Sequence, residues 1–241
     1  MKNSKLKAAL FAASVLISFS SVKAQKGFQI GVEGTPQLSY LINKADIDSK
    51  LYNTKHAVNG SFGISSQIGF TENIGLGVNV LYSFQGDKYE WKDVERYKQL
   101  QYIKVPIMLT LNFPFGSNMM FFGKVGPQID FLTDAKLLNK SGDVIRSNYR
   151  SGFQDYGLSA VLSAGVGYNI TSNLCIDIAV RYDAGLTNAE DEDFNLNIHD
   201  PFDYVTPVPA TSPRPMTHNM TTGVTRSEER RVGKECRSRW S

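Results

Sequence analysis

The sequence predicts an all-β protein, an eight-stranded antiparallel β-barrel that crosses a membrane. Three observations predict it: a leading segment laid out like an export signal, long segments in which apolar residues alternate with small or polar ones, and connections of alternating length. Alternation with a period of two is typical of strands whose two faces meet different surroundings. Short turns at one rim and long loops at the other are typical of bacterial outer-membrane barrels.

The first 24 residues have the three-part layout of a secretory signal. Three lysines precede an apolar stretch at residues 8–19, and the small residues Val22 and Ala24 stand before a cleavage point ahead of Gln25. The apolar stretch is shorter than the roughly 20 residues that a membrane-spanning helix needs. We therefore interpret residues 1–24 as a signal peptide and residues 25–225 as the exported barrel.

Eight strands account for most of the exported part. In the clearest, residues 157–170, Leu158, Leu162 and Val166 lie on one face, while the other face is small or polar. In chain order the predicted strands are 27–41, 58–70, 75–86, 98–113, 119–132, 156–170, 174–187 and a last one that begins near His218. The predicted short periplasmic turns are 71–74, 114–118 and 171–173, and the long extracellular loops are 42–57, 87–97, 133–155 and 188–217.

Aromatic residues on the apolar face gather near the two rims. Phe121 and Phe131 are ten steps apart, roughly 33 Å along a strand, and a tilt of about 40° reduces this to the apolar height of about 25 Å of such barrels. A soluble barrel or sandwich would not sort its aromatic residues by height. The predicted belt at the short turns comprises Phe28, Phe70, Phe113, Phe121 and Tyr168, and the belt at the long loops comprises Tyr40, Tyr82, Phe84, Phe131, Tyr156 and Tyr182.

The opposite face carries charge that the apolar face lacks. Between the belts the apolar face holds every second residue of 103–111 and of 176–180, from Ile103 to Leu111 and from Ile176 to Val180. None of these residues is charged, and contact with lipid requires that absence of charge. An eight-stranded barrel has room inside only for its own side chains, so balanced charge there favours a structural ion-pair network over a channel or a catalytic cluster. Its predicted members are Glu33, Lys104, Lys124, Asp130, Asp177 and Arg181.

The chain ends in a segment of different character. Residues 226–241 are densely charged, and we interpret them as a non-native tail derived from cloning or from a sequencing adaptor, so that the last strand is truncated after Thr225. The signal contributes four lysines and the tail six basic and three acidic residues, so the whole-chain charge of +3 becomes −4 for residues 25–225. This balance gives nucleic-acid binding no support. We expect the barrel to close weakly and to insert poorly into the membrane. Replacing residues 226–241 by a normal amphipathic end should restore insertion.

The sequence contains no recognisable catalytic motif. It has no GxSxG, HExxH, Walker or dinucleotide-binding pattern, and the acidic loop at residues 190–193 lacks the ligand spacing of a calcium loop. Cys175 has no cysteine partner in residues 25–225, which excludes an internal disulfide there. The histidines His56, His199 and His218 lie in or beside the long loops, so a lipid-modifying barrel enzyme with a histidine base is an open alternative. We predict no cofactor and no metal.

Four blocks resemble the PorT-like outer-membrane β-barrel family of Bacteroidetes. The block with the most specific pattern is YIKVPIMLTLNF, followed in order by GKVGPQIDFL, DYGLSAVLSAGVGYNI and LCIDIAVRYDAGLTN, at residues 102–113, 123–132, 155–170 and 174–188. The resemblance implies an eight-stranded barrel in the outer membrane, delivered through the periplasm, with no shared catalytic motif. It also implies a complete last strand whose terminal aromatic residue is read by the barrel-assembly machinery, and this chain departs from that pattern.

The sequence thus predicts a non-enzymatic outer-membrane protein with a structural or interaction role through its surface loops. Its expected partners are outer-membrane lipid and lipopolysaccharide, the barrel-assembly machinery and an envelope protein, but no nucleic acid. Three alternatives remain open: a lipid-modifying enzyme of the acyl hydrolase or transferase type, a small porin, and a soluble exported carrier shaped like a lipocalin.

Overall fold

The computed structural model describes residues 27–42, 53–91, 94–147, 149–171, 174–190 and 218–232. Within these residues the chain is almost entirely β-strand, and none of their helices is long and apolar enough to cross a membrane. The elements are β1 (Phe28–Ile42), β2 (Asn53–Gly69), β3 (Ile74–Trp91), β4 (Val94–Phe115), β5 (Met119–Asn139), β6 (Val144–Arg146), the 3₁₀ turn η2 (Arg150–Gly152), β7 (Tyr156–Asn169), β8 (Leu174–Gly185) and β9 (His218–Val232).

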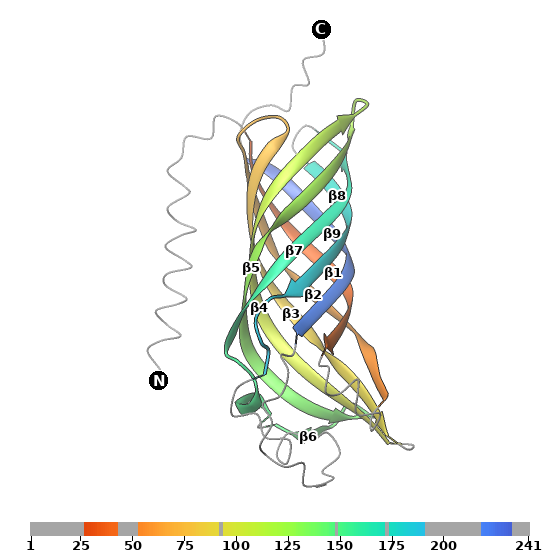
Figure 1. Cartoon of the computed structure of the whole chain (residues 1–241). Helices are drawn as coiled ribbons and strands as arrows, with labels where there is room; N and C mark the ends of the chain where they lie inside the picture. Colours follow the sequence, from red (N-terminus) through yellow and green to blue (C-terminus); the bar gives the residue numbers. More distant parts are fainter. Residues whose placement is uncertain are drawn as a thin grey trace.

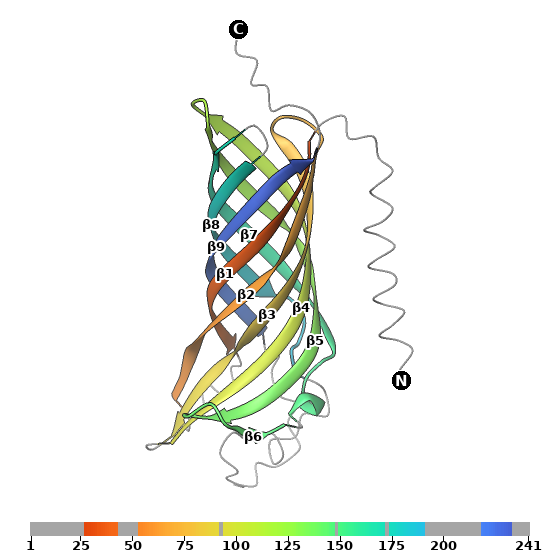
Figure 2. The same cartoon turned by 180° about the vertical axis from the view of Figure 1, so that it is seen from behind.

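Eight of these strands close into one antiparallel barrel. Each pairs with the next along the chain from β1 to β5, then β7, β8 and β9, and β9 pairs with β1. The short strand β6 lies outside this ring, paired with the end of β5. Figures 1 and 2 show a tall cylinder of inclined strands in which β9 lies between β1 and β8. The predicted eight-stranded antiparallel barrel is confirmed, and closure satisfies the backbone groups that an open edge would leave unpaired.

The two faces of the wall differ as the alternating pattern predicts. On β4, Ile107 and Leu109 are about 40% exposed on the outside, whereas Met108 and Thr110 between them are 3% and 1% exposed. The same alternation places the apolar residues of β1, β7 and β8 outside and their small and polar residues inside. The large exposed apolar surface belongs to a wall that faces hydrocarbon instead of water.

Aromatic side chains lie on the outside near both rims. Phe113 is the pairing partner of Phe121 near one rim, and Phe131 is the partner of Tyr156 near the other. Tyr40 lies on β1 opposite Met220, but its side chain is outside the described residues. Of the other predicted belt residues, Phe70, Phe113, Phe121, Phe131, Tyr156 and Tyr168 are exposed, and Phe28, Tyr82, Phe84 and Tyr182 are partly buried.

Strands continue through much of two predicted long loops. The predicted loop 87–97 is mostly a hairpin of β3 and β4, with Asp87 opposite Lys98 and Glu90 opposite Glu95. The predicted loop 133–155 includes the end of β5, β6 and η2. Beyond the membrane both faces of a strand can be polar, so the alternation that marks a strand fades there. Figure 2 shows β3, β4 and β5 reaching farther than β1, β8 and β9 at the same end.

The end of the last strand corrects the sequence interpretation. β9 does not stop at Thr225 but continues to Val232, paired with β1 on one side and β8 on the other. The reason is geometric, because β1 begins at Phe28 and β8 at Leu174, and both leave backbone groups that only a continued β9 can satisfy. Arg226 is exposed on the outward face, at a position where the other strands carry apolar residues.

Candidate functional site

The most connected group of side chains in the lumen is built around Arg181 on β8. Its Nε donates to Asp183 Oδ1 at 2.8 Å, Nη1 donates to Glu33 Oε1 at 3.0 Å and Nη2 donates to Gln128 Oε1 at 2.6 Å. All four side chains are buried. A planar guanidinium offers donors in several fixed directions, so Arg181 links β8 to both β1 and β5.

The contacts continue across the barrel from both acidic partners of Arg181. Lys104 Nζ on β4 donates to Asp183 Oδ2 at 2.7 Å, and Asn79 Nδ2 on β3 donates to Glu33 Oε2 at 2.7 Å. Asp130 joins through Gln128, whose Nε2 donates to Asp130 Oδ1 at 2.7 Å. We call this group the lumen network, and it comprises Glu33, Asn79, Lys104, Gln128, Asp130, Arg181 and Asp183.

The lumen network ties five strands together across the inside of the wall. Buried charges are tolerated where they have partners and further hydrogen bonds, and Arg181, Asp183 and Glu33 each have both. Such an arrangement can brace the barrel and obstruct its lumen. Its members include no histidine and no hydroxyl or thiol side chain.

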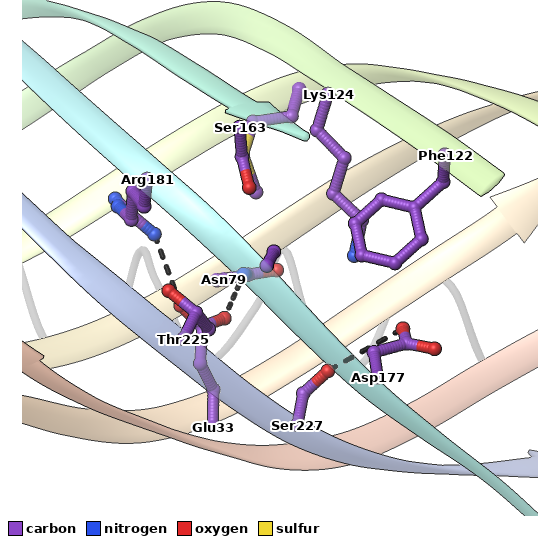
Figure 3. A pocket seen from close by; sticks show the side chains of 11 residues that line it. Glu33, Asn79, Phe122, Lys124, Ser163, Asp177, Arg181, Thr225 and Ser227 are labelled. Carbon is purple, nitrogen blue, oxygen red and sulfur yellow. Dashed lines mark hydrogen bonds and ion pairs between the residues drawn. The ribbon is translucent and has the colours of Figure 1, made fainter. Parts of the chain in front are cut away.

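Two further predicted residues lie outside the lumen network. Lys124 Nζ is 4.9 Å from the centre of the Phe122 ring, and Asp177 accepts hydrogen bonds from Cys175 Sγ at 3.2 Å and Ser227 Oγ at 3.5 Å. Figure 3 shows Lys124, Asp177 and Ser227 around a cavity that Arg181 and Glu33 also line. Its volume is about 20 Å³, which is room for about one water molecule.

The structure thus brings together four of the six predicted luminal residues. Glu33, Lys104, Asp130 and Arg181 share the lumen network, whereas Lys124 and Asp177 line the cavity beside it. The sequence interpretation missed Asp183, Gln128 and Asn79. Asp183 stands two residues after Arg181 on the same strand, so the alternating pattern alone places it inside the barrel.

A second, apolar cluster lies toward the long-loop end. Its buried residues come from β4, from β5 and from the segment around η2; they are Leu100, Tyr102, Leu132, Ala135, Leu137, Tyr149 and Phe153. The buried Lys98 ammonium stands 5.0, 5.9 and 5.4 Å from the ring centres of Tyr89, Tyr149 and Phe153. Its Nζ also donates to the Tyr89 hydroxyl at 3.2 Å. Attraction between ammonium and ring faces holds the segment around η2 against the hairpin.

The outer surface of the β3–β4 hairpin carries paired charges. Lys88 Nζ lies 2.7 Å from Glu95 Oε2, and Lys140 Nζ lies 3.4 Å from Glu95 Oε1. Hydrogen bonding from Lys88 holds the pKa of Glu95 below its usual range, and Glu95 in turn raises the pKa of Lys88. Lys55 on the neighbouring strand β2 pairs with Glu90, which lies on the β3 side of this hairpin.

Of the three histidines, His56 is the one whose side chain lies among the described residues. His56 is exposed on β2, opposite Asp87. His199 and the His218 side chain lie outside the described residues, although the His218 backbone begins β9. In the part of the chain that the structure describes, no three His, Cys, Asp or Glu side chains are placed to share a metal ion.

Comparison with known proteins supports the architecture. A family model described as "Outer membrane protein beta-barrel domain" matches residues 19–191. The fold is similar to that of Neisserial surface protein A, with a TM-score of 0.50, 10% identity, and coverage of 85% of this chain and 97% of that chain. It is also similar to the outer membrane protein OprG from Pseudomonas aeruginosa, with a TM-score of 0.50, 10% identity, and coverage of 86% and 96%. No curated protein matches the chain.

Proposed function

Because the chain belongs to the outer membrane protein beta-barrel domain family and is an outer-membrane protein, we propose that it is a non-enzymatic barrel with a closed lumen. In this proposal the barrel anchors the chain in lipid and its protruding hairpins contact another component of the envelope. The observation that carries the proposal is the lumen network, which joins β1, β3, β4, β5 and β8 through buried hydrogen bonds and ion pairs.

The closed lumen follows from size and charge. An eight-stranded barrel encloses a space that its side chains fill, and the cavity beside Arg181 holds about 20 Å³. A conducting path would need to separate Arg181 from Glu33 or Asp183, which would leave buried charges without partners. These two facts support a structural role for the lumen network over a small porin.

The interaction role is supported by the height of the hairpins. β4 has 22 residues, about 70 Å along the strand and about 55 Å in height at a tilt of about 40°, against an apolar band of about 25 Å. More than half of the height of this strand therefore lies outside the apolar band of the membrane. Its outer part carries Glu95 and Tyr97 beside Lys88 of β3, a charged and aromatic surface suited to an envelope protein or to the sugar and phosphate groups of lipopolysaccharide.

Several finer assignments belong to the same proposal. Residues 1–24 are a signal peptide, and the barrel is delivered to the outer membrane by the barrel-assembly machinery. The chain is a member of the PorT-like branch in Bacteroidetes, as its YIKVPIMLTLNF block favours. Residues 226–241 have a non-native origin, although residues 226–232 continue β9, and the outward position of Arg226 on β9 supports this reading.

Site-specific photo-crosslinking in intact cells tests the interaction role. A photoreactive amino acid replaces Tyr97 on the outer part of β4, and in a matched variant it replaces Leu109 on the lipid-facing part of the same strand. We expect a discrete protein or lipopolysaccharide adduct from position 97 and only phospholipid or lipid A acyl adducts from position 109. Equal lipid-only labelling at both positions would remove the support for a partner.

A chemical measurement separates this role from lipid modification. Replacing His56, His199 and His218 together by glutamine removes every histidine of the chain. We expect the acyl composition of lipid A and of phospholipids to be the same in cells that carry this variant, the unchanged protein or no copy. Suppose that the unchanged protein alters the acyl composition relative to cells without a copy, and that the variant does not. This result would establish an acyl-transfer or hydrolase activity.

A further inference from the structure

Among the described residues, the charges of the lumen network do not balance. The six luminal residues predicted from the sequence comprise three acids and three bases, and the structure adds Asp183, a fourth buried carboxylate. Among the described residues, Asp183 is shared by Lys104 and Arg181, and Glu33 is paired with Arg181. Two bases therefore stand against three acids in the lumen network, and the excess falls on Asp130.

Asp130 is surrounded by neutral partners. It is 7% exposed, and within the described residues its carboxylate accepts hydrogen bonds from the Gln128 amide and the Ser159 hydroxyl. Lys104 is its direct partner across β4 and β5, but the Lys104 ammonium is bound to Asp183. A buried carboxylate that lacks a counter-charge costs several kcal/mol, so this position calls for a cation or a proton.

A pocket lies beside Asp130 at the long-loop end of the lumen. Asp130, Tyr102 and Asn219 line it from inside, and Tyr156 and Leu158 line it where the wall meets the outside. Its volume is about 20 Å³, enough for one water-sized particle or an ion. Because Tyr156 is 70% exposed, the pocket borders the outer surface of the protein.

Asn219, which lines the same pocket, has a side-chain oxygen without a donor. Its Oδ1 is buried and has no hydrogen-bond partner among the described residues, while the amide nitrogen of the same side chain is bound to Gln85. The backbone also approaches closely here, because a Cβ atom on Gly185 would stand 2.7 Å from the carbonyl oxygen of Asn219. A buried amide oxygen without a donor is stabilised by a water molecule or by a cation beside it.

We propose that this pocket binds a small monovalent cation, an alkali-metal ion or an ammonium group, with Asp130 as the counter-charge and Asn219 Oδ1 as a neutral ligand. One excess negative charge matches one positive charge. A divalent ion would leave a net positive charge and prefers six or more oxygen ligands, several of them carboxylates. The site does not depend on whether the protruding hairpins bind a partner.

The test measures thermal unfolding of the refolded full chain in a zwitterionic detergent at pH 8. The unfolding temperature is recorded in increasing KCl, with N-methyl-D-glucamine chloride, whose cation is too large for the pocket, keeping the ionic strength constant. We expect a saturable rise of about 5 °C or more at a hundred times the half-saturating concentration. In Asp130→Asn and Asn219→Ala the unfolding temperature should be the same in the two salts.

Asp134→Asn is the matched control, because Asp134 lies on the same strand but is partly exposed and paired with Lys136. We expect it to keep the potassium response. A crystal soaked in RbCl should show an anomalous peak within the Asp130 pocket. If the unchanged protein unfolds at the same temperature in both salts, the proposal is overturned and Asp130 holds a proton instead. A potassium response that survives in Asp130→Asn would also overturn the proposal.

Discussion

The Lys104 ammonium lies 2.7 Å from the Asp183 carboxylate, although the residue directly opposite Lys104 on the neighbouring strand is another carboxylate, Asp130. Asp183 is on β8, separated from β4 by β5 and β7. Charge pairing inside this barrel is therefore decided by reach across the lumen and not by strand neighbours. The consequence is that β4 and β8 are tied together directly, in addition to the backbone ladder that runs around the wall.

The Lys104–Asp183 pair should be strongly coupled. Replacing Lys104 by methionine or Asp183 by asparagine leaves a buried charge short of its partner, so we expect each variant to lose about 3–5 kcal/mol of unfolding free energy. The double variant should lose much less than the sum, as urea unfolding in lipid vesicles can measure. The matched control is Lys136→Met with Asp134→Asn, a partly exposed pair for which we expect almost no change.

The outer face of β4 should reject charge at mid-depth. Arginine in place of Leu109, which is 41% exposed on the lipid-facing side, should cost about 2–4 kcal/mol of folding free energy in lipid vesicles. Arginine in place of Gln99, on the same face of the same strand but beyond the belts, should change the stability little. Equal costs at the two positions would mean that water, and not hydrocarbon, surrounds the wall.

The apolar cluster at the long-loop end should depend on Tyr149. Alanine there removes a fully buried ring that packs against Phe153 and lies near the Lys98 ammonium, so we expect a loss of about 3 kcal/mol. Hydrogen exchange should show faster opening of the outer parts of β4 and β5, with the membrane-spanning parts unchanged. Tyr156→Ala, which removes a mostly exposed ring, should leave exchange in the outer hairpin unaltered.

The pH response of the β3–β4 hairpin should follow Glu95. Its pKa is lowered in the folded protein by Lys88, so the contact stabilises the hairpin above the ordinary pKa of glutamate. That stabilisation is lost as the pH falls through the lowered pKa. A carboxyl NMR titration should show the Glu95 pKa moving upward in Lys88→Met. An unchanged titration in that variant would show that the Lys88 contact is absent in solution.

The continued last strand gives a further prediction. Truncation after Thr225 would leave the first part of β1, from Phe28, and the first part of β8, from Leu174, without their β9 partners. We expect this variant to fold less completely. The measurement is the fraction of the protein that shows heat-modifiable migration on a gel. A variant in which residues 226–232 alternate apolar and polar residues should fold at least as well as the original chain, because it removes Arg226 from the lipid-facing side. Equal folding of all three chains would contradict this role of β9.

The features that follow the two-residue period could be predicted from the sequence. Eight strands, the outward position of residues such as Ile107 and the inward position of Arg181 all follow from alternation between lipid and lumen. Asp183 follows the same rule, but it stands close to the predicted rim and was not assigned to the network. The pairs within the network could not be predicted, because they depend on distances across the lumen that no local pattern contains.

The sequence signal also fails where the surroundings of the two faces become alike. In the outer hairpin, Lys88 and Glu90 point outward while Asp87 points inward, so the pattern is polar on both sides and reads as a loop. At the C-terminal end, the dense charge hides the alternating pattern of a strand. β9 nevertheless continues to Val232, because it pairs with the backbone of β1 and β8. In both regions backbone pairing with a neighbouring strand, and not side-chain alternation, determines the structure.

The most direct test of the closed lumen is electrical recording from the refolded protein in a planar lipid bilayer. The account predicts no discrete conductance steps from the unchanged chain, because Arg181, paired with Asp183 on its own strand, also holds Glu33 and Gln128 across the inside of the barrel. It also predicts that Arg181→Ala lowers the stability of the barrel without opening a stable pore. Reproducible, large single-channel steps from the unchanged protein would contradict the account.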